Sequence, residues 1–318
     1  MRFNPKARLD RSRVSDSGRR GGGAGGTGMR LPIPGGAKAG GGIGGLVLVI
    51  IVIVIFQLVG GGGDGSGGVP SSGGSLDTSR VDAGGTERYA NCQTGEDANQ
   101  DEDCARVAVE NSLTDFWADT LESQSGVSFS PEKGLATFSG AINTGCGQAS
   151  SQVGPFYCPA DRNIYLDTTF FEDVLQGQLG GPAGDFVEPY VLAHEYGHHI
   201  QNLTGAMGKV RTQQGPESDS VRLELQADCY AGMWARAATS TEDASGVPLI
   251  TDITQQDMAE ALEAAKSVGD DRIQQQSGGR VDPESWTHGS AEERQRWFQT
   301  GYQQGSMDAC DTFSASQL

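Results

Sequence analysis

The chain has 318 residues, a formal net charge of −18 and only 36% apolar residues. The absence of a strict Gly-X-Y repeat excludes collagen, the lack of sustained heptads excludes a coiled coil, and the single long apolar run excludes a polytopic membrane protein. Glycine is unevenly distributed, since 25 of the 48 glycines lie in residues 1–85. The residues from 86 onward are numerous enough for one substantial hydrophobic core or two small ones.

The N-terminal residues 1–42 differ in charge from the rest of the chain. They contain nine lysines and arginines but two aspartates, a charge of +7, so the remaining 276 residues carry −25. This Gly-rich composition predicts a disordered basic tail that fixes membrane topology, with contact to nucleic acid or anionic lipid as the alternative. The acidic body argues against a nucleic-acid partner for the body.

Residues 43–59 form the apolar run, 17 residues near the short limit for a membrane helix. An uncleaved signal anchor is favoured. A buried core segment is disfavoured because Gly-rich tracts flank the run on both sides, and a cleaved signal peptide because its N-terminal region would be unusually long and Gly60–Gly63 is a poor cleavage site. Positive charge on its N-terminal flank places the N-terminus in the cytoplasm and the body outside. The Gly/Ser-rich residues 60–86 predict a flexible linker, so the folded domain is expected at 87–318.

All six cysteines follow the apolar run, as expected for disulfides in an extracytoplasmic domain. Zinc ligation is the alternative, but no C-x-x-C pair supports it. Six cysteines allow fifteen pairings, and sequential pairing makes the shortest loops. The favoured pairs are Cys92–Cys104, Cys146–Cys158 and Cys229–Cys310.

The order of the predicted elements indicates an α+β fold. Apolar spacing and capping signals predict a first helix at 100–123, and short runs between Gly and Pro turns predict extended structure at 134–169. Four more helices are expected at 186–203, 218–238, 254–275 and 290–304. These elements predict a mainly helical domain with a small antiparallel sheet, and one transmembrane helix precedes this domain in the chain.

The predicted helix at 186–203 carries the H-E-x-x-H pattern of His194, Glu195 and His198. Residues i and i+4 share one helix face, so the two imidazoles can bind one Zn²⁺. Glu195 lies about 100° around the helix, close enough to act as general base on a metal-held water.

A catalytic zinc site needs a third protein ligand. Glu224 and Asp228 lie four residues apart on the next predicted helix. Glu224 can ligate the metal, while Asp228 can bind the other ring nitrogen of a histidine and fix its orientation. The alternative is that both are ordinary solvated helix charges.

The H-E-x-x-H motif and the segment around Glu224 and Asp228 resemble the bacterial neutral zinc metallopeptidases, a gluzincin-type group. The resemblance covers about residues 87–318, including HEYGHH, RLELQADCYAGMWA and WTHGSAEERQRWFQTGY. It implies Glu224 as the third ligand and Asp228 as the carboxylate behind the first histidine. It also implies that the strand at 163–167 borders the cleft and pairs with an extended substrate.

The sequence does not decide which side chain donates a hydrogen bond to the oxyanion. His288, the only histidine outside the motif, is one candidate, with Tyr157, Tyr165 and Tyr196 as rivals. A local cap or packing role is the alternative for His288. His199 points away from the metal face and is interpreted as a structural or supporting residue.

The sequence therefore predicts a membrane-anchored, extracytoplasmic zinc metalloendopeptidase that acts on peptides or proteins. The alternative is a non-catalytic, metal-stabilised cell-surface binding or assembly module. Hydrolysis of a non-peptide amide, such as a cell-wall crosslink, would use the same metal chemistry. Neither the oligomeric state nor the physiological substrate follows from the sequence.

Overall fold

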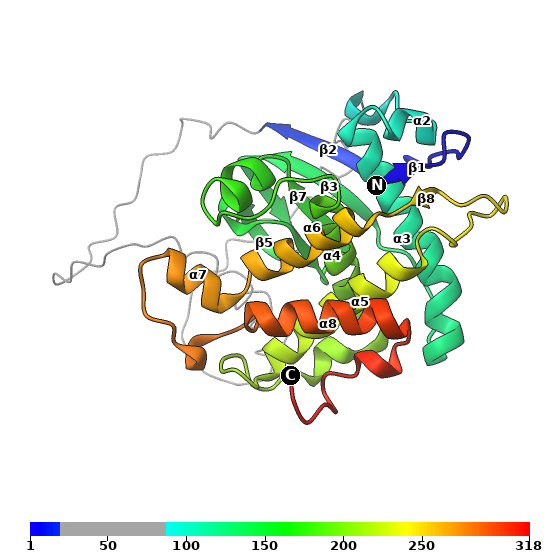
Figure 1. Cartoon of the computed structure of the whole chain (residues 1–318). Coiled ribbons are helices and arrows are strands. Elements are labelled where there is room, and N and C mark those ends of the chain that lie inside the picture. Colours follow the sequence, from blue (N-terminus) through cyan, green and yellow to red (C-terminus); the bar gives the residue numbers. More distant parts are fainter. Residues whose placement is uncertain (20–86) are drawn as a thin grey trace, which may run out of the picture.

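The structure is a computed structural model that describes residues 1–19 and 87–318. Most of the regular secondary structure in the described part is helical, with a small sheet on one side (Figure 1). The helices are α2 Gly95–Ala98, α3 Glu102–Ser125, α4 Val187–Thr204, α5 Asp219–Ala237, α6 Gln255–Ser267, α7 Asp270–Gln276 and α8 Ala291–Gln304. The predicted α+β, mainly helical fold is confirmed.

The main sheet has four strands in the order β2-β3-β7-β6. Two short two-stranded sheets, β1-β8 and β4-β5, accompany it. The strands are β1 Arg2–Phe3, β2 Val14–Arg19, β3 Gly134–Ser139, β4 Ala141–Thr144, β5 Gly147–Ser150, β6 Phe156–Cys158, β7 Asn163–Asp167 and β8 Ile250–Asp252.

Two expectations about this sheet are wrong. It is mixed rather than antiparallel, because β2–β3 and β3–β7 are parallel pairs and only β6–β7 is antiparallel. The hairpin β4–β5 and strand β6 lie between β3 and β7 in the chain, which gives β7 room to return in parallel. The strand at 163–167 is also paired on both sides, so its main-chain groups are not free for a substrate, and β6 lies at the edge.

The helix ends follow local sequence signals. The Asp101 side chain caps α3, Gly205 ends α4 in the left-handed conformation at φ 76°, and Ser290 forms a capping box with Glu293 at the start of α8. The single helix expected at 254–275 is instead two, because the backbone of Gly269 is extended and lies against Ala291.

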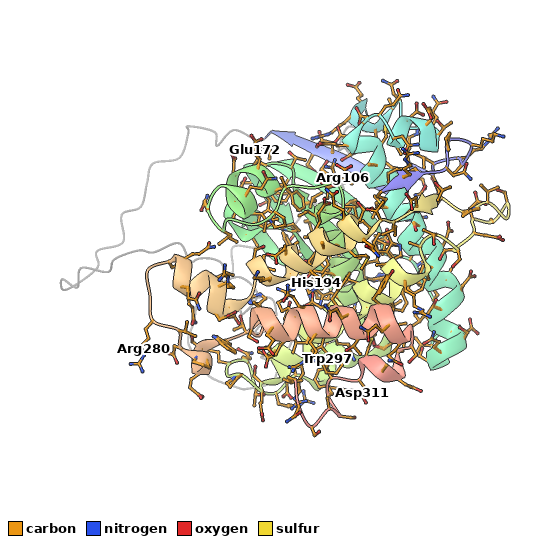
Figure 2. All side chains as sticks on the ribbon, viewed as in Figure 1. Arg106, Glu172, His194, Arg280, Trp297 and Asp311 are labelled. Carbon is orange, nitrogen blue, oxygen red and sulfur yellow. A yellow bond between two sulfur atoms is a disulfide. The ribbon has the colours of Figure 1, made fainter. Side chains whose placement is uncertain are left out.

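Close helix contacts bring the ligand-bearing segments together. A Cβ at Gly197 would lie 3.1 Å from the Cα of Ala227, so the glycine in the H-E-x-x-H motif lets α4 approach α5. Gly232 and Gly301 play the same part between α5 and α8, since a Cβ at either would overlap backbone of the opposing helix. The labelled His194 consequently lies near the centre of the fold (Figure 2).

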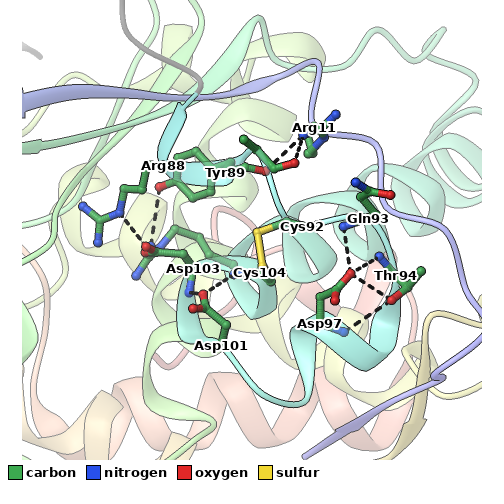
Figure 3. Close-up of a disulfide and its surroundings, with 12 residues drawn as sticks. Arg11, Arg88, Tyr89, Cys92, Gln93, Thr94, Asp97, Asp101, Asp103 and Cys104 are labelled. Carbon is green, nitrogen blue, oxygen red and sulfur yellow. Dashed lines mark hydrogen bonds and ion pairs between the residues drawn. A yellow bond between two sulfur atoms is a disulfide. The ribbon is translucent and has the colours of Figure 1, made fainter.

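The three disulfides confirm the predicted pairing of Cys92–Cys104, Cys146–Cys158 and Cys229–Cys310. Figure 3 shows the first of them between the segment before α2 and the first turn of α3. Three disulfides suggest an extracytoplasmic location for the folded body.

Residues 1–19 belong to the folded body, so the expectation of a disordered tail at 1–42 is wrong for this part. Strand β1 pairs with β8, and β2 pairs with β3 at the edge of the main sheet. Phe3, Ala7 and Val14 are buried, and these anchors are few enough for the Gly-rich average composition to hide them. The packing also conflicts with a cytoplasmic N-terminus and an exported body, because paired strands must lie on the same side of a membrane.

Among residues 1–19 and 87–318, no helix has the length and hydropathy required to cross a bilayer. The predicted anchor at 43–59 and the predicted linker at 60–86 lie outside the described residues.

Candidate metal centre and active site

The side chains of His194, His198 and Glu224 converge between α4 and α5. One ligand atom from each lies within 4.8 Å of the others, and the three side chains are only 7%, 12% and 4% exposed. The Glu224 carboxylate lies 3.2 Å from Nε2 of His194 and 3.5 Å from Nε2 of His198. Two imidazoles and a carboxylate are a ligand set that Zn²⁺ uses in catalytic sites, so the residues fit this metal.

The Nδ1 atoms of both histidines are held by other side chains. Nδ1 of His194 lies 2.9 Å from Oδ1 of Asp228, and Nδ1 of His198 lies 2.8 Å from Oε1 of Gln201. Gln201 in turn donates to the carbonyl of Leu223 on α5 at 2.6 Å. These contacts turn both Nε2 atoms toward Glu224 and fix the ring orientations.

Asp228 is fully buried and is itself compensated by two groups that the sequence reasoning did not assign. Arg294 on α8 donates to both carboxylate oxygens, at 2.8 and 3.0 Å, and the Tyr190 hydroxyl donates to Oδ1 at 2.6 Å. Burial alone would raise the Asp228 pKa, but Arg294 and His194 hold it at about 2. Arg294 lies in the segment WTHGSAEERQRWFQTGY but is 100 residues away from His194 in the sequence, so no local spacing indicated its role.

The electrostatics of this cluster favour a cation at its centre. Burial opposes a charged imidazole, but the neighbouring Asp228 and Glu224 carboxylates overcome this and raise the His194 pKa to about 10. Burial would raise the Glu224 pKa, yet His198 and His194 lower it well below its ordinary value. Glu224 therefore stays ionised in a buried site that lacks an arginine or lysine of its own among its described contacts.

Glu195 and the three side chains of this cluster line one pocket, and Glu195 is 7% exposed. Burial raises its pKa, while the two motif histidines and the backbone amide of Tyr157 on β6 oppose the rise. A carboxylate with a raised pKa is a better proton acceptor at neutral pH than an exposed one. The contact with Tyr157 also shows that the edge strand β6 borders the site.

His288 lines the same pocket, in the loop before α8. Its Nδ1 lies 2.8 Å from Oγ1 of Thr287 and 3.3 Å from Oδ1 of Asp270. Burial would lower its pKa, but Asp270 raises it, so the imidazole is a strong donor through its other nitrogen. Oδ2 of Asp270 accepts the backbone N–H groups of Thr287, His288 and Gly289, which fixes this loop.

The three tyrosine alternatives are engaged elsewhere. The Tyr157 hydroxyl contacts Nδ1 of His199 and accepts from Asn202. The Tyr165 hydroxyl donates to Asp161, and that of Tyr196 contacts Thr114 on the far side of α4. His199 is fully buried, and burial lowers its pKa to about 4, which agrees with the structural role expected for it.

The pocket in front of Glu195 has a mainly apolar wall. This wall comes from β6, from the π-helix Phe170–Gln176, and from α4 and α7. Its members include Phe156, Phe170, Val174, Leu179, Val191 and Ile273. A pocket of this kind can bind a large apolar side chain next to a few fixed polar groups.

The chain belongs to the family described as "Putative neutral zinc metallopeptidase", whose model matches residues 4–313. It is 51% identical over 229 residues to the uncharacterized protein Rv2575 of Mycobacterium tuberculosis, which covers 71% of this chain and 76% of that protein. It is 42% identical over 225 residues to the uncharacterized protein YpfJ of Escherichia coli K12, which covers 69% of this chain and 74% of that protein. No solved structure is significantly similar to the chain.

Proposed function

We propose that this protein is a zinc-dependent endopeptidase whose catalytic body lies outside the cytoplasm. The observation that carries the proposal is the convergence of His194, His198 and Glu224 beside Glu195 in one pocket. A purely structural zinc site needs no general base and is commonly closed by four protein ligands. Here a buried carboxylate and an apolar-walled pocket adjoin the ligand cluster.

The described residues divide the work of hydrolysis among them. His194, His198 and Glu224 would hold Zn²⁺, which when bound polarises the scissile carbonyl and makes water more acidic. Glu195 accepts a proton from the attacking water and delivers it to the leaving amine. His288 donates a hydrogen bond to the carbonyl oxygen as negative charge develops there.

The substrate is proposed to be a peptide or protein in extended form. Strand β6 is at the edge of the main sheet, so its main chain can pair with an added strand. The apolar wall selects a large apolar side chain next to the scissile bond.

The test compares the wild-type chain with Glu195→Gln on quenched fluorescent peptides with Leu or Phe at the scissile position. The base contributes about 10²- to 10⁴-fold to kcat, so Glu195→Gln loses activity by that factor while elemental analysis still finds one zinc per chain. The matched control is Glu172→Gln, an exposed glutamate on the π-helix, which retains activity.

Other outcomes separate the alternatives. Undiminished hydrolysis by Glu195→Gln contradicts the general-base role. A wild-type protein that binds zinc but cleaves no peptide favours the non-catalytic binding module, unless it hydrolyses a non-peptide amide such as a cell-wall crosslink.

A further inference from the structure

Residues 1–19 occupy a surface of the body that is shaped to receive them. The backbone of this segment passes directly over Gly95 and Gly134, and a Cβ at Gly134 would lie 2.7 Å from the carbonyl oxygen of Arg13. The Asn111 side chain bonds the N–H of Asp10 at 2.7 Å and its carbonyl at 2.8 Å.

A second asparagine receives the segment in the same way. The Asn99 side chain bonds both main-chain groups of Phe3, at 2.9 Å each. The guanidinium of Arg11 donates to the carbonyls of Tyr89 and Ala90, close to the Cys92–Cys104 disulfide (Figure 3). A side chain that bonds both the N–H and the C=O of one residue holds the backbone itself, as main-chain hydrogen bonds do in strand addition.

The segment also brings a charge that the body lacks at this place. Glu110 on α3 and Glu132 before β3 are 2% and 1% exposed, and both Glu132 oxygens have no hydrogen-bond partner among the described residues. Nε of Arg13 lies 2.8 Å from Glu110 and 3.6 Å from Glu132. Burial and the neighbouring Glu110 raise the pKa of Glu132 well above its ordinary value, so the carboxylate that Arg13 compensates is that of Glu110, with which it makes the shorter contact.

This cluster lies behind the active-site helix. The Tyr196 hydroxyl, from the H-E-x-x-H motif, contacts Oγ1 of Thr114 at 3.1 Å, and Thr114 donates to Glu110 at 3.0 Å. The face of α4 that does not bear the ligands therefore rests on the cluster that Arg13 compensates.

We propose that residues 1–19 are a docking segment that binds the body of the same chain, on the same side of the membrane, and completes it through Arg13. All six cysteines lie at position 92 or later, so no disulfide holds the segment in place. The contacts described above are therefore what keeps it bound. This proposal does not depend on the protein being a peptidase.

The position of the segment can be tested in cells that export the full-length protein. Arg2 and Asp252 are exposed partners across β1 and β8, so the pair Arg2→Cys with Asp252→Cys is expected to crosslink within one chain. The matched control joins Arg2→Cys to Asp119→Cys, an exposed position on α3, and is expected not to crosslink.

A protease site engineered into residues 60–86 lets a non-reducing gel detect the bond between the two parts of the chain. No crosslink in the paired variant overturns the docking proposal. A crosslink that links two chains overturns docking within one chain and indicates exchange of the segment between copies.

The role of Arg13 can be tested through charge rather than shape. Arg13→Gln is expected to lower the thermal midpoint of the full-length protein by about 6–12 °C, while Arg8→Gln, at an exposed arginine of the same segment, lowers it by less than about 2 °C. Adding Glu110→Gln to Arg13→Gln removes the carboxylate that Arg13 compensates and is expected to restore at least half of the loss. An unchanged midpoint in Arg13→Gln, or no recovery in the double variant, contradicts the charge role.

Discussion

The two faces of helix α4 each adjoin a cluster of buried carboxylates, and they neutralise charge differently. On one face, Asp228 is compensated by Arg294, but the close charged contacts of Glu224 within residues 1–19 and 87–318 are the two motif histidines, with no arginine or lysine. On the other face, Arg13 reaches both Glu110 and Glu132, and no metal-ligand cluster occurs there among the described residues.

The difference shows how one fold separates a binding site from a structural ion pair. Burying a carboxylate is costly unless a positive charge compensates it. Behind α4 the chain supplies that charge itself. In front of α4, beside an open pocket, the chain leaves Glu224 to be compensated by a cation from solution.

The largest expected effect comes from removing Glu224, the buried carboxylate that has no arginine among its described contacts. Glu224→Ala is expected to lower zinc content well below one per chain and to reduce peptide hydrolysis by at least about 10³-fold, because a catalytic site needs its third ligand. Elemental mass spectrometry and a peptide assay measure the two effects. The control is Glu217→Ala, an exposed glutamate just before α5. Full zinc content in Glu224→Ala would show that another group is the third ligand.

The sequence predicted the pocket face of α4 much better than the opposite face. His194, Glu195 and His198 lie within one turn, and Glu224 and Asp228 repeat the spacing of four on the next helix, so local periodicity was enough to place them together. Arg294, Gln201 and Asp270 were missed because they meet the site only through tertiary packing. Asp270 begins α7 and precedes His288 by 18 residues, so only the folded loop reveals the contact.

The cluster on the opposite face of α4 is formed by residues that lie far apart in the sequence. Arg13 and Glu110 are 97 residues apart, and Arg13 lies in a region whose glycine and charge content masks three buried apolar residues. The disulfide pairing was predictable because loop length is a property of sequence alone, and the structure confirms it.

A smaller effect on catalysis is expected from removing His288, which lines the pocket. His288→Ala is expected to lower kcat about 10²- to 10³-fold with zinc retained, because it removes one donor to the developing oxyanion. His288→Gln, which keeps an N–H donor, is expected to recover part of the loss. Steady-state kinetics with metal analysis checks this, and kinetics equal to the wild type in His288→Ala would remove the donor role.

The smallest predicted effect concerns Asp115 on α3, a partly buried carboxyl near Glu110. Burial raises its pKa from 3.8 to about 6, with Asp243 and Glu110 adding to the rise. A folded-state pKa above the unfolded value means that this group lowers stability as pH rises from about 4 to about 6.

Asp115→Asn is therefore expected to raise the thermal midpoint by about 2–4 °C at pH 7, which corresponds to about 1 kcal/mol after allowance for solvent screening, and by nothing below about pH 4. Thermal unfolding at both pH values measures the difference. Asp119→Asn, an exposed aspartate on the same helix, serves as control. An equal gain at both pH values would assign the effect to packing rather than to charge.

The pairing of β2 with β3 and of β1 with β8 has a consequence for the time course of folding. The Asn4 side chain bonds the carbonyl of Pro248, 244 residues later, so the first strands to leave the ribosome must wait until most of the chain has been synthesised. Contacts of such high sequence separation slow the search for the native topology. Closure of the N-terminal strands is thus expected to be a late kinetic phase, after the helices around α4 have assembled.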